Sequence, residues 1–465
     1  SKVVVTTNTP LLQTETGSQS TTLTAKSMQL LPQVGEDWQN FVILMPGTSG
    51  TPQNASDPLN PGQRASVNGN LPYSSVLADG ATTTLPMSQN SDVTVFETTS
   101  EVKIDTSAFS AQYGVGGVLY NQITKGGTNQ FHGSAYEYFQ NDALNAAAYQ
   151  FSKQTRSAAI AFTRFNNFGG SIGGPILRNR MFFYFDYDKT INHGNASQGY
   201  ETVPTPAELA GDFSGLTYAD PNTGATLPLL IYDPTTQVIT NTPNGPVVTR
   251  QTFAAEYGNG NKIPSNLIDP VATAIQSYFP KPNTPATVVN GVDTNNFYYN
   301  VPSSNPVTAY FGRLDFDITH HNRLTASETS SDNPATYLNQ GICPINCQNG
   351  DVSRDNAQVS DVWTINPNTI NEARMGFTDQ LNFFTPFSLN QGFPQKLGWQ
   401  FAKADTFPNI NINQFYNLAP QSNAVYKEFV FDPSDVVTMV RGKHVIHFGG
   451  EFLISRADLM KGKQP

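Results

Sequence analysis

The stretch YFGRLDFDI, residues 310–318, alternates between apolar and polar side chains, which predicts a β-strand with two different faces. Its apolar face carries Tyr310, Leu314, Phe316 and Ile318. The same period of two marks nine candidate strands from residue 131 onward, including 181–189 and 371–379. If these strands close around a lumen, the polar residues expected to line it are Arg313, Asp315, Asp317, Glu372 and Arg374. We therefore expect a mainly β protein built from antiparallel strands.

The connections between these strands alternate strictly between short and long. The short ones are 174–180, 319–322, 366–368 and 441–443, and the long ones are 142–164, 191–306, 332–355 and 383–426. A soluble sandwich has no reason to keep its long loops at one end, whereas an outer-membrane barrel has tight periplasmic turns and long outside loops. Nine is an odd number and an open edge in lipid is unfavourable, so we expect an incomplete barrel whose remaining strands lie beyond Pro465.

The composition supports strands and long loops over helices. Only 13% of the 465 residues are charged, against roughly 25% in ordinary soluble domains, and the chain contains 36 Gly and 32 Pro. A net charge of −10 argues against nucleic acid as a partner. No apolar run approaches the roughly 18 residues of a membrane-spanning helix, and only a short helix around 25–31 is expected.

Two cysteines, Cys343 and Cys347, stand four residues apart in the loop sequence CPINC. This spacing fits a small local disulfide, which implies an oxidising compartment. Free thiols are the next alternative. A zinc site would need two more ligands, and the nearest histidines, His320 and His321, match no standard spacing.

Two segments carry a resemblance to a known family. SAQYGVGGVLYNQITKGGTNQFHGSAYEYFQND, residues 110–142, resembles the plug-to-barrel junction of TonB-dependent outer-membrane transporters. FNNFGGSIGGPILRNRMFFYFDYD, residues 165–188, resembles the Oar-like group of that family. The resemblance implies a transmembrane antiparallel β-barrel of roughly 22 strands, of which about nine are present, with an N-terminal mixed α/β plug. The implied divisions are an N-terminal segment at 1–20, a plug at 21–130 and a partial barrel at 131–465, with a large outside loop at 191–306.

The resemblance also implies a location in the bacterial outer membrane and energy supplied by TonB with ExbB and ExbD. The candidate TonB box consists of Lys2, Val3, Val4, Val5 and Thr6, although a plain strand or linker explains these residues as well. The expected function is energised uptake of a large or scarce extracellular ligand, such as a peptide, glycan or siderophore. The alternative is a surface-exposed β-rich adhesin or carbohydrate-binding protein.

No motif indicates an enzyme or a cofactor. The glycines of TKGGTN are not followed by the Lys-Ser/Thr and helix of a phosphate-binding loop. We interpret this motif as the bend where plug meets barrel, formed by Lys125, Gly126, Gly127, Thr128 and Asn129. The six histidines are scattered outside any catalytic or metal-binding frame.

The sequence allows two interpretations for each of three features. The lumen-facing residues either bind the plug and keep the channel wet, or relay substrate. The aromatic residues of the long loop either capture ligand or form the loop's own core, and they are Tyr232, Tyr257, Tyr278, Phe279, Tyr298 and Tyr299. In the first predicted barrel strand, Phe131 and Phe139 share one face and Tyr136 and Tyr138 the other, but the pattern leaves the lipid-facing side open.

Overall fold

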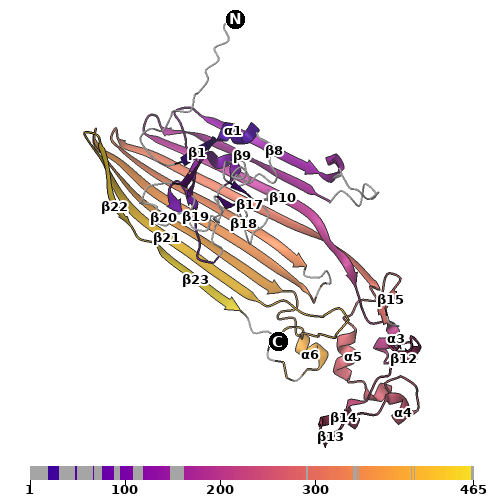
Figure 1. Ribbon diagram of the computed structural model, residues 1–465. Coiled ribbons are helices and arrows are strands. Elements are labelled where there is room, and N and C mark those ends of the chain that lie inside the picture. The colour runs from indigo at the N-terminus through magenta and orange to yellow at the C-terminus, as the bar shows by residue number, and fades with distance from the viewer. Residues whose placement is uncertain are drawn as a thin grey trace.

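Two β-sheets make up most of the described chain (Figure 1). The computed structural model describes residues 19–30, 48–49, 66–67, 76–87, 95–107, 119–146, 162–289, 292–338, 343, 345–399, 401–402 and 404–461, and structural statements below refer to these residues.

The small sheet has five strands, and all of them come before residue 125 in the sequence. Its order is β1-β6-β7-β4-β5, and only the β4–β7 pair is parallel. The bounds are β1 Gln19–Thr24, β4 Val76–Ala78, β5 Ala81–Thr82, β6 Thr99–Ser107 and β7 Leu119–Thr124. Helix α1, Ala25–Leu30, follows β1 where the sequence predicts a short helix. Strands β2 (Thr48–Ser49) and β3 (Ser66–Val67) pair only with each other. Buried Met28, Val76, Phe96, Val102, Ile104 and Tyr120 form one core.

The large sheet contains nine strand positions in chain order, each antiparallel to the next. Its strands are β8 His132–Asn141, β9 Arg164–Leu177, β10 Met181–Glu201, β17 Phe297–Thr319, β18 Asn322–Leu338, β19 Cys347–Asn366, β20 Thr369–Pro386, β21 Ala424–Arg441, β22 His444–Glu451 and β23 Ile454–Lys461. β22 and β23 pair with successive parts of β21 and share the ninth position. The predicted nine antiparallel strands are therefore confirmed, and the barrel is not closed, because β8 does not pair with β22 or β23.

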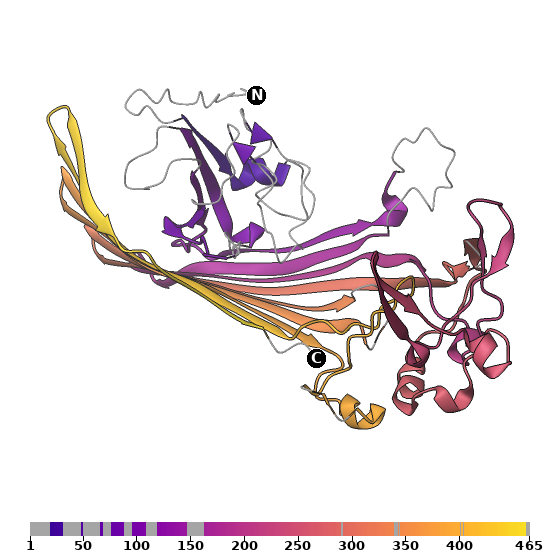
Figure 2. The same cartoon turned by 60° about the horizontal axis from the view of Figure 1, so that its bottom comes forward.

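The two faces of the large sheet have different surroundings. Figure 2 shows the small sheet against one side of the curved large sheet, which we call the inner face. Arg313 and Asp315 point to this face, and Asp315 is fully buried. Tyr310 and Leu314 point to the opposite, outer face, where they are 50% and 44% exposed. The period-2 assignment of this strand is therefore correct.

The strict alternation of short and long connections is present, but the predicted limits of the long ones were wrong. β10 and β17 pair along their whole lengths as far as Glu201 and Phe297, so the largest excursion is 202–296 instead of 191–306. The next two run only over 339–346 and 387–423. The short turns are 178–180, 320–321, 367–368 and 442–443.

The described parts of the three excursions 202–296, 339–346 and 387–423 fold together at one end of the large sheet (Figure 2). Their elements are α3 Pro206–Leu209, β11 Thr217–Ala219, β12 Thr226–Pro228, β13 Val238–Thr242, β14 Gly245–Thr249, α4 Phe253–Tyr257, α5 Pro270–Gln276, β15 Thr287–Val289, β16 Val292–Thr294 and α6 Phe393–Leu397. They share a core that we call the loop cluster, made of Val203, Phe279, Ile345, Phe393, Leu397, Phe407, Tyr416 and Leu418. A disulfide joins Cys343 to Cys347 beside Ile345. None of the helices in the described ranges is long and apolar enough to cross a membrane.

Candidate functional site between the two sheets

The site begins with a tight turn in the small sheet. β4 and β5 pair across the two residues Asp79 and Gly80, which both have positive φ angles, 44° and 86°. A two-residue turn of this kind favours Asp-Gly, because aspartate tolerates and glycine freely adopts the left-handed region. The turn carries segment 76–87 toward the inner face of the large sheet, where most of its polar contacts lie.

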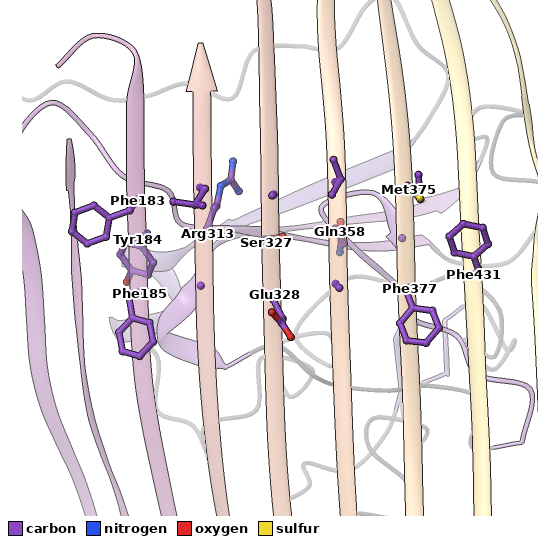
Figure 3. Close-up of a pocket in the computed structure, with 16 residues that line it drawn as sticks. Phe183, Tyr184, Phe185, Arg313, Ser327, Glu328, Gln358, Met375, Phe377 and Phe431 are labelled. Carbon is purple, nitrogen blue, oxygen red and sulfur yellow. The ribbon is translucent and has the colours of Figure 1, made fainter. Parts of the chain in front are cut away.

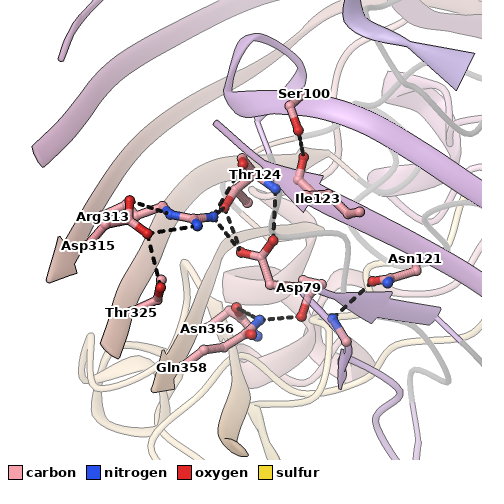
Figure 4. Close-up of polar contacts among 12 residues, drawn as sticks. Asp79, Ser100, Asn121, Ile123, Thr124, Arg313, Asp315, Thr325, Asn356 and Gln358 are labelled. Atoms are coloured by element: carbon pink, nitrogen blue, oxygen red, sulfur yellow. Dashed lines mark hydrogen bonds and ion pairs between the residues drawn. The ribbon is translucent and has the colours of Figure 1, made fainter. Parts of the chain in front are cut away.

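Arg313 on β17 is the main charged contact between the sheets (Figure 4). Its Nη1 donates to the carbonyl oxygen and the Oγ1 of Thr124, at 3.2 and 2.8 Å, and lies 3.6 Å from Oδ2 of Asp79. Its other nitrogens donate to both oxygens of Asp315, at 3.1 and 3.0 Å. Asp79 also accepts from the amide and hydroxyl of Thr124, at 2.9 and 2.6 Å. One guanidinium thus joins β17 to strand β7 and to the β4–β5 turn of the small sheet.

Other inner-face side chains bind the main chain of segment 76–87. Nε2 of Gln358 donates to the carbonyl oxygen of Ala78 at 2.6 Å. The remaining contacts run from Arg374 to the carbonyl of Gly80, from Thr378 to the carbonyl of Thr82 (3.4 Å), from the amide of Thr82 to Asp432 (2.9 Å) and from the amide of Met87 to Glu428 (2.7 Å). Four strands of the large sheet, β17, β19, β20 and β21, therefore hold this segment.

The five predicted junction residues connect the sheets. Gly126 lies so close to Asp315 that an added Cβ would stand 2.7 Å from its Oδ2, and at Gly127 it would stand 2.3 Å from the carbonyl oxygen of Phe183. Asn129 exchanges two hydrogen bonds with Asn179 in the 178–180 turn, at 2.8 and 2.7 Å. Thr128 makes only local hydrogen bonds, to Gln130 and His132, and Lys125 lies 3.7 Å from Glu97. The glycines thus allow a close backbone approach of the connection to β10.

A second polar seam fixes the orientation of β8. The hydroxyl of Tyr138 donates to Glu97, in the short 3-10 helix 96–98 that precedes β6, at 2.5 Å, and that of Tyr136 donates to Asp188 at 3.0 Å. Phe131 and Phe139 lie on the opposite face and are 71% and 56% exposed. The tyrosine face of β8 therefore points inward, which settles the orientation that the sequence pattern left open.

The other predicted site residues do not join this site. Asp317 lies 3.8 Å from Arg323, and Glu372 pairs with Arg374 at 2.9 Å without touching the small sheet. The candidate TonB box at 2–6 lies outside the described residues. The sequence did not identify Asp79, Gln358 and Glu97 as contact residues. Asp79 was visible only as part of the Asp-Gly turn dipeptide, and Gln358 and Glu97 only as polar residues of predicted strands.

The six candidate loop aromatics separate into three groups. Phe279 belongs to the loop cluster and Tyr278 packs edge-on against Phe393 and Phe407. Tyr232 and Tyr257 are 53% and 41% exposed. Tyr298 and Tyr299 lie on β17, so their assignment to a loop was wrong.

Electrostatics in the excursion 202–296 stabilises the loop itself. Hydrogen bonds from the side chain and amide of Thr235 hold the pKa of Asp233 below its usual range, and the hydroxyl of Tyr257 donates to the same carboxylate at 3.2 Å. Across the described ranges, no three His, Cys, Asp or Glu side chains converge as metal ligands would.

Residues 123–465 match the family described as outer membrane beta barrel domain. The chain belongs to this family. It lies in the bacterial outer membrane, and its inferred resemblance to Oar-like TonB-dependent transporters is confirmed. Over 165 residues it is 28% identical to the TonB-dependent transporter Oar of Myxococcus xanthus, covering 33% of this chain and 14% of Oar. The fold is similar to that of the outer membrane transporter YddB from Escherichia coli, with 10% identity, a TM-score of 0.53 and coverage of 94% of this chain and 48% of YddB. The chain thus spans less than half the length of these relatives.

Proposed function

We propose that the small sheet is the plug of a TonB-dependent outer-membrane transporter and that the large sheet is part of the barrel that surrounds it. The observation that carries this proposal is the binding of segment 76–87 by inner-face side chains of four strands. A domain held in this way across a lumen blocks passage through it. Uptake of a ligand then requires these contacts to be broken.

The contacts are suited to reversible release. Apart from those of Arg313, most of them are single hydrogen bonds to main-chain atoms, contributing about 1 kcal/mol net from a neutral side chain and about 1.5–3 kcal/mol from a charged one. A pulling force on the N-terminal side of the plug would break such bonds one after another. In this proposal TonB, energised by ExbB and ExbD, binds residues 2–6 and supplies that force.

The ligand in this proposal binds outside, above the plug. The loop cluster is a folded structure at the opposite end of the large sheet from the tight turns, so it has a rigid core from which to present a binding surface. Exposed Tyr232 and Tyr257 on this structure are candidates for ligand contact, since amphipathic aromatics are enriched at binding surfaces. A peptide, glycan or siderophore suits such a surface.

The test uses the full-length protein expressed in cells with and without TonB. Pools of labelled siderophores, oligopeptides and oligosaccharides are offered, and binding to cells is measured separately from accumulation inside. We expect one pool to accumulate only when TonB is present, and a variant lacking residues 2–6 to bind that pool without accumulating it. Accumulation that is equal without TonB would refute energised transport. Accumulation that persists in the deletion variant alone would refute only the TonB-box assignment.

The alternative, a surface adhesin or carbohydrate-binding protein, shares the outer-membrane location and differs in transport. It predicts that a glycan pool binds to cells with no accumulation in any strain. The buried contacts of segment 76–87 favour the transporter, because an adhesin has no need to fill the inside of its barrel with a separate domain.

A further inference from the structure

The β13–β14 hairpin carries exposed aliphatic side chains on both of its faces. Val238 and Ile239 on β13 are 57% and 58% exposed, and Val247 and Val248 on β14 are 48% and 52% exposed. Residues 238–249 include no charged and no aromatic side chain. Figure 1 shows the hairpin at the tip of its excursion, away from the large sheet, and its two strands pair only with each other. Exposed apolar clusters of this kind mark binding surfaces.

Lipid does not account for the exposure of the hairpin. On the outer face of the large sheet, Phe185 and Phe377 are also exposed (Figure 3), but in an outer-membrane barrel that face meets lipid. The hairpin belongs to the excursion 202–296, at the end of the large sheet opposite the tight turns. The long loops of such barrels are extracellular, so its aliphatic side chains stand in water.

The hairpin is fixed at its base by hydrogen bonds from both strands. The amide of Asp233 donates to the carbonyl oxygen of Gln251 at 2.9 Å, and the amide of Gln251 donates to Oγ1 of Thr236 at 2.8 Å. The guanidinium of Arg250 donates twice to Oε1 of Gln237, at 3.1 and 2.5 Å. The hairpin is therefore held in one orientation before a ligand arrives, which lowers the ordering cost of binding.

The two edges of the hairpin offer different main-chain groups. The residues that flank the two-residue turn 243–244 form a hydrogen-bonded pair, and such pairs alternate along an antiparallel ladder. Ile239 and Asn241 of β13 therefore point their N–H and C=O groups away from β14. Pro246 and Val248 are the corresponding residues of β14, but proline has no N–H, so this edge has lost a donor. The edge of β13 is complete, and no described residue pairs with it.

The chemistry of this edge suits one class of ligand. An unpaired strand edge binds an extended peptide through main-chain hydrogen bonds, while neighbouring side chains contact alternate side chains of the peptide. An anionic chelate requires Lys or Arg, and a sugar ring packs on aromatic rings, and residues 238–249 provide neither.

The length of the edge argues against a second copy of this chain as the occupant. β13 has five residues and is roughly 16 Å long. One strand added along it covers far less than the roughly 800 Å² per partner of a stable protein–protein interface. A short peptide needs no larger surface than this.

We propose that β13 binds an extended, uncharged peptide rich in aliphatic residues as a third strand of the hairpin. The N–H groups of Ile239 and Asn241 donate to carbonyl oxygens of the peptide, and their own carbonyl oxygens accept from its amides. Ile239 contacts peptide side chains on one face, and Val238 contacts those on the other. This inference rests on the proposed function, of which it names the ligand class.

The test measures binding of a fluorescent, acetylated peptide, Thr-Val-Thr-Val-Thr-Val-Thr, to the full-length protein in lipid nanodiscs. The matched probe is the same peptide with all of its inner amides N-methylated, which keeps the side chains and removes the donors. We expect the methylated peptide to bind at least about tenfold more weakly, because the added strand can no longer donate to β13. This comparison needs no protein variant. Equal binding of the two peptides would overturn the proposal.

A pair of variants tests the edge itself. Asn241→Pro removes an outward donor and leaves the hydrogen bonds within the hairpin intact, so it should weaken peptide binding at least about tenfold. Asn241→Ala loses the same side chain but keeps the N–H, and it should bind the peptide as tightly as the unmodified protein. Equal affinities of the two variants would contradict the proposal. Self-association of the protein that Asn241→Pro abolishes would also overturn it, since a second copy would then occupy the edge.

The outcomes for binding and for transport are separable. Peptide binding that depends on the 241 amide, without TonB-dependent accumulation of any pool, would refute the proposed transport alone. TonB-dependent accumulation of another pool, with no binding of the peptide, would refute this inference alone.

Discussion

Replacing Arg313 with alanine should loosen segment 76–87 far more than it disturbs β17. The substitution removes two hydrogen bonds to Thr124 and the ion pair with Asp79. The Arg313 side chain that makes these contacts is only 16% exposed. A hydrogen bond to a charged group contributes about 1.5–3 kcal/mol, and removing one partner of a buried pair costs about 3–5 kcal/mol. We therefore expect the local opening free energy of the segment to fall by about 3 kcal/mol.

Hydrogen exchange followed by mass spectrometry measures this opening directly in the full-length protein. A loss of about 3 kcal/mol corresponds to roughly a hundredfold faster exchange, because every 1.4 kcal/mol is tenfold. Peptides covering 76–87 and 119–124 should show this acceleration. Strand β17 should change much less, since Asp315 keeps Arg323 at 3.3 Å and Thr325 at 3.0 Å and the strand ladder remains.

The matched control is Lys262→Ala, which removes an ion pair of 2.8 Å to Asp212 in the excursion 202–296. The side chains of Lys262 and Asp212 are 49% and 33% exposed, so solvent screens this ion pair and the effect should be small and confined to that excursion. Unchanged exchange in 76–87 for a folded Arg313→Ala protein would refute the assignment of Arg313 as the main contact. An effect no larger than that of the control would do the same.

Three other changes have predicted results. Gly127→Ala should lower the free energy of unfolding of the small sheet by at least about 2 kcal/mol, because the new Cβ would stand 2.3 Å from the backbone oxygen of Phe183. Phe407→Ala should remove about 3–5 kcal/mol from the loop cluster, since this ring is fully buried, and protease digestion should then cut the excursions first. Reducing the Cys343–Cys347 disulfide should speed hydrogen exchange of residues 343–348 and leave the small sheet unchanged.

Two variants serve as controls for these predictions. Gly215→Ala places its Cβ in open space and should be nearly neutral in a thermal melt. Phe401→Ala changes the same residue type in the same excursion as Phe407, but its ring is 86% exposed, so digestion should be unaffected. If Gly127→Ala and Gly215→Ala lowered stability equally, the packing argument for Gly127 would be contradicted. Equal protease sensitivity of Phe407→Ala and Phe401→Ala would contradict the argument for Phe407.

The period of two predicted the strands wherever one face meets lipid and the other meets the lumen. It failed at the outer ends of β10 and β17, which continue to Glu201 and begin at Phe297. These ends contain proline, glycine, serine and asparagine, and the apolar alternation stops there. Backbone pairing with the neighbouring strand maintains them, and that pairing has no signature in one strand's own sequence.

The loop aromatics and the Arg313 contacts show a different limit. Tyr278 and Tyr232 have similar sequence surroundings, but Tyr278 is enclosed because residues from three separate excursions meet there. Asp79 was identified only as a turn residue, because its cation lies on another sheet far along the chain. Polarity alone predicted that Arg313 and Arg374 face inward, whereas their partners depend on how the two sheets dock.

The docking chemistry explains how one inner face can hold a domain firmly and still release it. Gln358, Asp432 and Glu428 bind main-chain atoms of segment 76–87. Such contacts depend on the path of the backbone more than on the side chains of the segment, so they are lost together once the turn at 79–80 shifts. Arg313 is different, because it binds both Asp79 and Thr124. A pull on β7 therefore strains the contacts that Thr124 makes with Arg313 and with Asp79, and their failure leaves Arg313 as the remaining partner of the Asp79 carboxylate, which weakens the hold on the segment.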